Sequence, residues 1–298
     1  MEVKRKDLLQ YENKRFFSKK LWVCIIIFFV INSIFLGYRY KETKDDIIYK
    51  EIVNEYKGES TTEKNQQIID NAIYYNNIIE SYLEVTDEYA RGKINDDVFE
   101  KYISDYNYAK HHINALERLS DHAKTFLKSD SKTFYFYDVA WDKLLDKHID
   151  WSFLFMTIIL FVPYFYIDYD TKIFAINNSY YKYKKILHFR LKYAICVIIL
   201  LQVVWFAMEL GIVNIFSSLP DAFSSACSLQ GFTSVHSIIS LLSLFVIKMI
   251  IFIIADILAI VVLYFISAKL RNKILATILM IFYLPLSWYV CMELLTKL

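Results

Sequence analysis

The chain has 298 residues, of which 56% are hydrophobic, 17% aromatic and 22% charged. This mixture predicts membrane-spanning segments combined with a water-exposed domain. Three prolines and five glycines are too few for a turn-rich β architecture, so we expect an all-α fold. A formal net charge of +2 is too small to indicate nucleic-acid binding.

The first apolar segment, residues 21–38, carries no charge and is long enough to cross a membrane as a helix. Residues 1–20, which precede it, hold seven Lys/Arg against three Asp/Glu. This excess predicts a cytoplasmic N-terminus, and the absence of a small-residue cleavage site favours an uncleaved anchor over a secretory signal peptide. Four further spans are expected, at residues 151–168, 193–216, 237–268 and 274–296.

Residues 237–268 form an ambiguous apolar stretch. As one helix, the roughly 31 residues from Ser237 to Ser267 would measure roughly 46 Å, which exceeds a hydrocarbon core of about 30 Å but is too short for two spans. We therefore expect Val235 to Ile247 to be an interfacial or re-entrant lead-in and Met249 to Ser267 to be the crossing. The chain then has about five spans.

The loops between the spans differ in charge. Residues 169–192 contain six Lys/Arg and residues 269–273 contain three, whereas residues 217–236 contain none. Because cytoplasmic loops are enriched in Lys and Arg, the first two loops are predicted to be cytoplasmic and the third to be an outer loop. This orientation places residues 39–150 outside the cytoplasm.

Residues 39–150 hold 16 Lys/Arg and 23 Asp/Glu and are predicted to form a helical extracytoplasmic domain. Ser60 to Glu63 has the pattern of a capping box that opens a helix ending near Gly92. A second helix is expected from Asn95 or Asp96 to the polar break at Ser129. Tyrosines at heptad-like spacing form either the packing seam of this hairpin or a surface that binds a partner.

No metal-binding residue is expected in this chain. His111, His112 and His122 lie on a charged helix without a supporting set of ligands, so we interpret them as part of its solvated face. The four cysteines show no spacing typical of zinc, redox or disulfide sites.

The order of segments resembles the ABC-2-type permeases of bacterial ABC transporters, and the similarity covers most of the chain. Tyr11 to Lys20 (YENKRFFSKK) resembles that family's N-terminal segment, in which an acidic residue precedes basic and aromatic ones. Phe136 to Leu145 (FYDVAWDKLL) and Pro163 to Lys192 resemble the passage into the second span and the coupling segment. The matching residues of the first segment are Glu12, Lys14, Arg15, Phe16 and Phe17.

The segment at residues 169–192 has its own pattern. Apolar residues at spacings of 3, 4, 3 and 4 predict a helix lying along the membrane surface, with basic residues off the apolar stripe. Such a helix can bind anionic lipid, whereas the resemblance implies that it docks on an ATPase subunit; both can hold together. The coupling residues that follow from the resemblance are Asp168, Asp170, Tyr180, Lys182, Tyr183, Lys184 and Lys185.

Two acidic residues lie within predicted spans, where a charge costs roughly 2.5–3.5 kcal/mol at the helix centre. Asp256 lies near the middle of the fourth span, and Glu209 lies toward the outer end of the third. Asp256 either lines a substrate pathway or makes a packing or subunit contact. Glu209 is expected to be mostly structural.

The chain contains no GxxxxGK[ST] sequence and no HExxH or GxSxG motif, so we expect neither an enzyme nor a cofactor site. The resemblance implies a permease subunit of an exporter, driven by a separate ATP-binding subunit and paired with a second copy or a similar subunit in a bacterial cytoplasmic membrane. Five spans instead of the family's usual six leave an alternative, a membrane sensor or interaction protein whose outer hairpin binds a partner.

Overall fold

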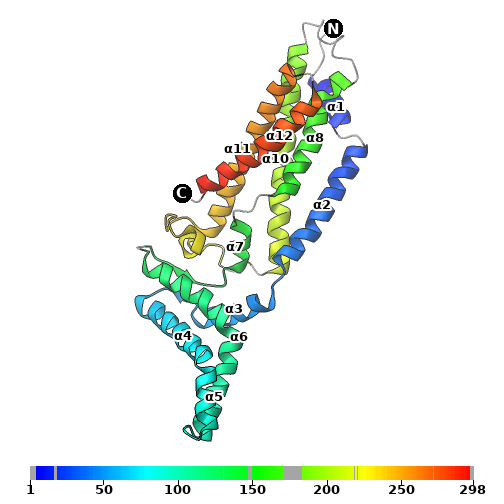
Figure 1. The fold of residues 1–298 in the computed structure, drawn as a ribbon. Helices are drawn as coiled ribbons and strands as arrows, with labels where there is room; N and C mark the ends of the chain where they lie inside the picture. The colour runs from blue at the N-terminus through cyan, green and yellow to red at the C-terminus, as the bar shows by residue number, and fades with distance from the viewer. Residues whose placement is uncertain are drawn as a thin grey trace. The chain divides into compact units, whose positions relative to one another are not determined.

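We describe the fold from a computed structural model, over residues 5–16, 19–129, 131–146, 150–170, 183–217, 219, 221–270 and 272–295. The chain separates into two compact units. The helix bundle comprises Met1–Arg39, Leu144–Ile215 and Phe245–Lys297, and the inserted domain comprises Tyr40–Lys143 and Phe216–Leu244. Both are helical, which confirms the expected all-α class for the described residues (Figure 1).

The helix bundle contains five helices long and apolar enough to cross a membrane, as the sequence predicted. They are preceded by the short helix α1 (Arg5–Phe16). The five are α2 (Lys19–Tyr40), α8 (Trp151–Asp170), α10 (Tyr183–Phe216), α11 (Leu241–Lys269) and α12 (Lys273–Leu295). The chain is therefore a multi-pass membrane protein.

Helix α8 is the centre of the bundle. In the most apolar stretch of α8, 67% of the residues are buried, compared with 22% in α2 and 28% in α12. The ring of Phe153 on α8 lies 5.5 Å from Trp205 of α10 and 6.0 Å from Trp288 of α12. The outer helices instead expose apolar side chains such as Ile34 and Phe35, which suits contact with lipid.

Helix α11 differs from the expected lead-in followed by a crossing. Leu241–Lys269 is one continuous helix of 29 residues, so the residues assigned to the lead-in divide between this helix and the turn before it. Ser240 explains the start, because its hydroxyl accepts a hydrogen bond from the amide of Ser243 at 3.2 Å. A helix of about 43 Å is longer than the hydrocarbon core and can be accommodated by tilt.

The inserted domain is built on a helical hairpin. Its helices are α3 (Lys44–Glu55), α4 (Thr62–Glu80), α5 (Tyr82–Ala90), α6 (Asp96–Leu127) and α7 (Val139–Leu145). Two short strands, β1 (Gly58–Glu59) and β2 (Phe134–Tyr135), pair antiparallel with Gly58 opposite Tyr135. Residues 226–228 and 230–232 form two 3₁₀ turns.

The predicted hairpin is confirmed, with differences at its helix ends. Asn95 caps α6 through its side chain, and Gly92 has the positive φ of +72° that a turn requires. Helix α4 is capped by Thr61, whose hydroxyl accepts from Lys64 N at 3.2 Å, so the expected capping box at Ser60 to Glu63 is wrong by one residue. A break at Ser81 separates α4 from α5.

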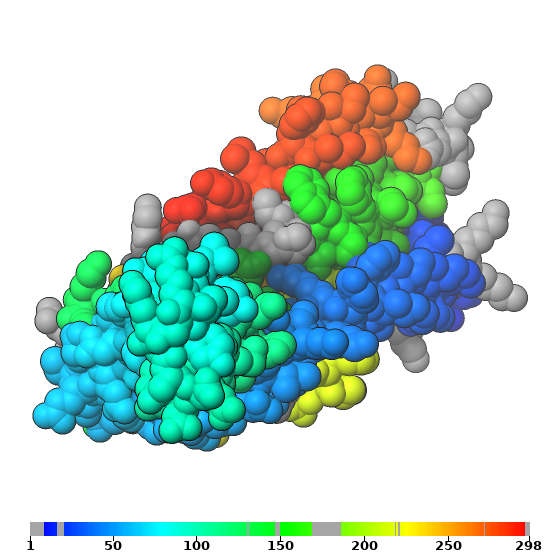
Figure 2. All heavy atoms as spheres, turned by 60° about the horizontal axis from the view of Figure 1, so that its bottom comes forward, coloured from blue at the N-terminus to red at the C-terminus, as the bar shows by residue number. Residues whose placement is uncertain are grey.

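Stacked rings hold the tip of the hairpin together. Tyr82 and Tyr106 stack at 4.0 Å between ring centres, and Tyr89 and Phe99 at 3.8 Å. The cyan atoms of this region form a compact lobe facing the viewer in Figure 2. The tyrosines thus act as a packing seam, one of the two roles considered from their spacing.

The interpretation of His122 as a solvated residue is wrong. Its side chain is 3% exposed and lies among the core of the inserted domain, beside Tyr49 and Phe126. Its Nδ1 atom is 3.4 Å from Oδ2 of Asp138, a carboxylate that is also buried. The heptad position of His122, three residues after Leu119, points to the buried face of α6 and could have revealed this.

Candidate functional site

Four charged side chains meet at the end of the bundle where α1 lies. We name Glu12 and Arg15 of α1, Asp168 of α8 and Arg190 of α10 the four-charge cluster. Asp168 is ion-paired with Arg15 and, at 2.9 Å, with Arg190. Arg190 is also 3.6 Å from Glu12. The cluster therefore joins α1 to α8 and α10, which lie far from it in the sequence.

Burial makes the four-charge cluster energetically demanding. Glu12, Asp168 and Arg190 are each at most 1% exposed. Two carboxylates and two guanidinium groups balance one another, which is the condition under which buried charges are tolerated. Loss of one member would leave an uncompensated charge, so the cluster holds α1, α8 and α10 in a defined arrangement.

Aromatic residues enclose the four-charge cluster. The hydroxyl of Tyr164 donates to Glu12 Oε2 at 2.7 Å, and that of Tyr193 donates to Asn13 Oδ1 at 2.5 Å. The ring of Phe16 packs against Phe161 and Tyr164 at 5.3 and 5.0 Å. These rings exclude water, which strengthens the ion pairs inside.

The structure thus brings together residues that the sequence placed in separate segments. Glu12, Arg15 and Phe16 of the N-terminal match lie with Asp168, which was expected to end the second span. Arg190 had been counted only as a loop charge. Its spacing of 3, 4 and 7 residues from the buried residues Tyr193, Ala194 and Val197 is the signal that could have placed it inside.

The other expected coupling residues lie at the edge of the described structure or beyond it. Asp170 is the last residue of α8, and the first turn of α10 begins with Tyr183, Lys184 and Lys185, but their side chains are outside the described part. Tyr180 and Lys182 fall outside the described residues.

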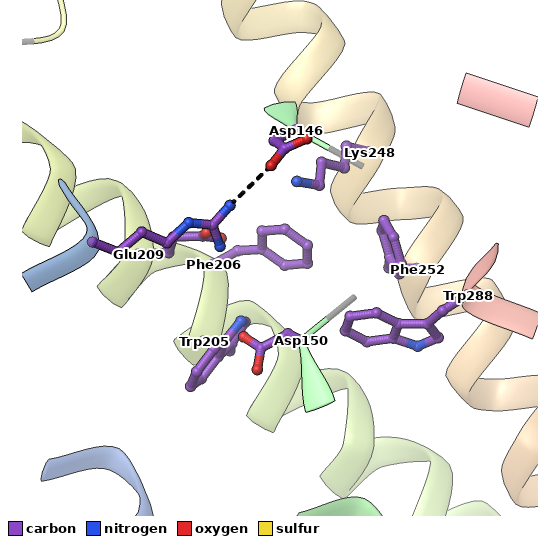
Figure 3. Close-up of a pocket in the computed structure, with 9 residues that line it drawn as sticks. Asp146, Asp150, Trp205, Phe206, Glu209, Lys248, Phe252 and Trp288 are labelled. Atoms are coloured by element: carbon purple, nitrogen blue, oxygen red, sulfur yellow. Dashed lines mark ion pairs between the residues drawn. The ribbon is translucent and has the colours of Figure 1, made fainter. Parts of the chain in front are cut away.

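A second polar site lies at the other end of the bundle helices from the four-charge cluster. Figure 3 shows the side chains that line it. Its cavity measures 20 Å³, room for about one water molecule. Arg39 of α2 pairs with Asp146 at 3.6 Å, and Lys248 of α11 donates to the Leu144 carbonyl at 2.7 Å. The cavity is lined by Arg39, Asp146, Asp150, Trp205, Phe206, Glu209, Lys248, Phe252 and Trp288. We name it the polar pocket.

Glu209 and Lys248 bring charge of both signs to the polar pocket from within spans. Each is only 7% exposed. Figure 3 shows the Lys248 ammonium directed toward Asp146, with the ring of Phe206 beside them. Glu209, expected to be mostly structural, is therefore one of the residues that line a polar cavity inside the bundle.

Asp256 lies deeper in the bundle and does not line the polar pocket. It is 0% exposed, and its Oδ1 accepts a hydrogen bond from the indole Nε1 of Trp288 at 3.0 Å. Its Oδ2 has no hydrogen-bond partner among the described residues. The Trp288 ring packs against Phe252 at 4.3 Å, so Asp256 is tied to the aromatic interior. Its contact to Trp288 fits the packing role that was weighed against a pathway.

Gln202 of α10 is a buried polar residue that the sequence did not single out. It is 0% exposed, and neither its amide nitrogen nor its amide oxygen has a hydrogen-bond partner among the described residues. An amide inside an apolar span is itself a signal, because membrane helices rarely bury polar groups without a role.

No protein-family model matches the chain, and no curated protein or solved structure is similar to it.

Proposed function

We propose that the chain is the membrane subunit of an ABC transporter of the ABC-2 type, an exporter in a bacterial cytoplasmic membrane that is driven by a separate ATPase subunit. The observation that carries the proposal is the four-charge cluster. The resemblance matched Glu12 and Arg15 in one loose pattern and Asp168 in another, and these positions, more than 150 residues apart, are joined by ion pairs. The ion pairs were not used to find the sequence patterns, so the contact between these residues is independent support for the resemblance.

The position of the cluster also suits a coupling role. Asp168 immediately precedes the segment at residues 169–192, in which the docking contacts of the ATPase are expected, and Arg190 lies near the end of that segment. A movement of that segment would act on both helices that leave it, and the ion pairs would carry it to α1. Because separating buried charges is costly, these three helices would respond together.

Two copies, or one copy and a similar subunit, would form the translocation pathway. The polar pocket and Asp256 place charged groups within the spans, where they are rare and mark functional or packing sites. In the proposed orientation the inserted domain lies outside the cytoplasm, and the basic coupling segment also contacts anionic lipid.

The test is co-purification from native membranes in a mild detergent, followed by identification of bound P-loop proteins. We expect one ATPase to be retained by the wild type and lost when Lys182, Lys184 and Lys185 are replaced together by Glu. The matched control is the same replacement at three exposed lysines of the inserted domain, Lys93, Lys101 and Lys110. This control should retain the ATPase.

If the wild type retains no ATPase, the sensor or interaction protein replaces the transporter as the better account. The feature that favours this second candidate is the apolar surface of the hairpin. Leu83 is 79% exposed and Val98 is 57% exposed, although both lie on a water-soluble domain.

A further inference from the structure

Three side chains of the inserted domain converge where α6 meets α7. His122 comes from α6, Asp138 immediately precedes α7, and Asp142 lies in its first turn. One donor atom of each lies within 4.8 Å of the other two. His122 and Asp138 are 3% and 2% exposed, whereas the Asp142 side chain is 33% exposed.

The contact between His122 and Asp138 is of ion-pair length, and this length also fits two ligands of one metal ion. Nδ1 of His122 and Oδ2 of Asp138 are 3.4 Å apart, and Oδ2 accepts no hydrogen bond among the described residues. Two ligands bound at about 2.0–2.1 Å from a tetrahedral zinc ion lie about 3.3–3.4 Å from each other. The observed separation is that of a tetrahedral edge.

His122 and Asp138 are both buried, so water has little access to the unpartnered Oδ2 of Asp138. A buried carboxylate oxygen without a donor is costly, and a bound cation would offset that cost.

Arg118 neutralises the other side of the site. Its Nη2 is 3.5 Å from Oδ1 of Asp138 and 3.0 Å from Oδ2 of Asp142. The guanidinium lies 4.3 Å over the ring of Tyr49, and its side chain is 34% exposed. It can therefore turn toward solvent, away from the two carboxylates, which opens a way in for an ion.

We propose that His122, Asp138 and Asp142 bind a divalent transition-metal ion of the Zn²⁺ class, with water as the fourth ligand. One nitrogen and two carboxylate ligands suit Zn²⁺ better than Ca²⁺ or Mg²⁺, which require more oxygens. Arg118 holds the two carboxylates in the metal-free protein and competes with the ion. The ion fastens α7 to α6, and the site does not depend on the proposed transport function.

The experiment is calorimetric titration of the tag-free full chain in detergent with Zn²⁺, repeated with Co²⁺ to record the visible absorption of a tetrahedral site. We expect one ion per chain. His122→Ala should abolish binding, whereas His111→Ala, an exposed histidine on the same helix, should leave it unchanged. Arg118→Gln should tighten binding at least several-fold because a competing charge is removed.

Absence of saturable Zn²⁺ binding by the wild type at micromolar concentrations would overturn the proposal, as would unchanged binding by folded His122→Ala. If His122→Ala does not fold, Asp142→Asn decides instead, because this side chain is partly exposed and nearly isosteric with its replacement. It should weaken binding tenfold or more, and unchanged affinity in this variant also rejects the site.

Discussion

At the scale of single residues, the bundle depends on a few buried polar groups that must satisfy one another. Arg190 forms ion pairs with two carboxylates, those of Glu12 and Asp168. Because Arg190 is only 1% exposed, solvent cannot take over its role in neutralising them. Among the described residues, Asp256 accepts a hydrogen bond from the indole of Trp288 and from no other group. Substitutions at these positions should lower the stability of the bundle far more than substitutions of exposed charged residues.

Replacing Arg190 by Ala should destabilise the bundle strongly. Two buried carboxylates would remain with only Arg15, and removing one partner of a buried ion pair typically costs about 3–5 kcal/mol. The readout is the midpoint of thermal unfolding in detergent. Lys192→Ala, two positions away and exposed, should shift the midpoint little. Equal shifts for the two variants would mean that the cluster does not stabilise the bundle.

Asp256→Asn should be tolerated structurally because the amide keeps an oxygen that can accept the Trp288 hydrogen bond. Trp288→Phe removes the donor, leaves Asp256 buried without it and should cost about 1–3 kcal/mol or more. Thermal unfolding of both variants measures this difference. Full transport activity in a well-folded Asp256→Asn protein would remove Asp256 from the pathway and leave its packing role.

At the scale of elements, helix ends decide how the inserted domain is organised. Helix α3, which the sequence analysis did not identify, begins with a complete capping box: Thr43 N donates to Asp46 Oδ2 at 2.9 Å and Asp46 N donates to Thr43 Oγ1 at 3.1 Å. Lys143 adds an ion pair to the same Asp46 oxygen at 3.0 Å. Asp46 therefore ties the start of α3 to α7.

The stability of the inserted domain should depend on the ionisation of Asp46. Burial alone would raise the pKa of Asp46, but the Thr43 hydrogen bonds and Lys143 outweigh it and hold the pKa below its ordinary value. The native state then binds the proton less readily than the unfolded state. The stabilisation is fully present above the unfolded-state pKa, near 4, and is lost as pH falls through the lower native pKa.

Asp46→Asn should consequently be less stable than the wild type at pH 7, and this difference should shrink at pH 3. Hydrogen exchange of the α3 amides at the two pH values measures it. Asp45→Asn, an exposed neighbour, serves as the control and should show little effect at either pH. A difference for Asp46→Asn that is as large at pH 3 as at pH 7 would contradict this assignment.

The elements show what sequence patterns can and cannot predict. Predominantly apolar runs of about 20 residues identify spans because the bilayer sets their length, and the Asn95 cap located α6. Helix α3 was not predicted because its charged sequence, KDDIIYKEIVNE, has only a weak apolar stripe and follows closely after the first span. The first residue of α11 was not predicted either. Hydropathy shows how long an apolar segment is, but it does not show at which serine the helix begins.

For the candidate site, the sequence identified most of the residues but could not predict that they lie together. Glu12, Arg15 and Asp168 were singled out in separate motifs, while Arg190 was hidden among loop charges. His122 was misassigned because its buried partner, Asp138, lies 16 residues further along and is brought to it only by tertiary packing. Contacts between distant segments depend on the packing of helices, which no local pattern specifies.

At the scale of the whole molecule, the two units divide the chemistry between them. The bundle carries five spans, and its described residues form the four-charge cluster and the polar pocket. The inserted domain carries its own hydrophobic core, a tyrosine-stacked hairpin and the histidine–aspartate site. In the proposed permease subunit, the four-charge cluster of the first unit serves coupling.

In the proposed function the segment at residues 169–192 contacts an ATPase, and photo-crosslinking in living cells tests this contact most directly. A photoreactive amino acid at Tyr183 should form a covalent adduct with a P-loop ATPase, identified by mass spectrometry. The same amino acid at Tyr289, a 58% exposed residue of α12, should not. Recovery of only lipid adducts, or of another protein, from position 183 would contradict the account of this chain as a transporter subunit.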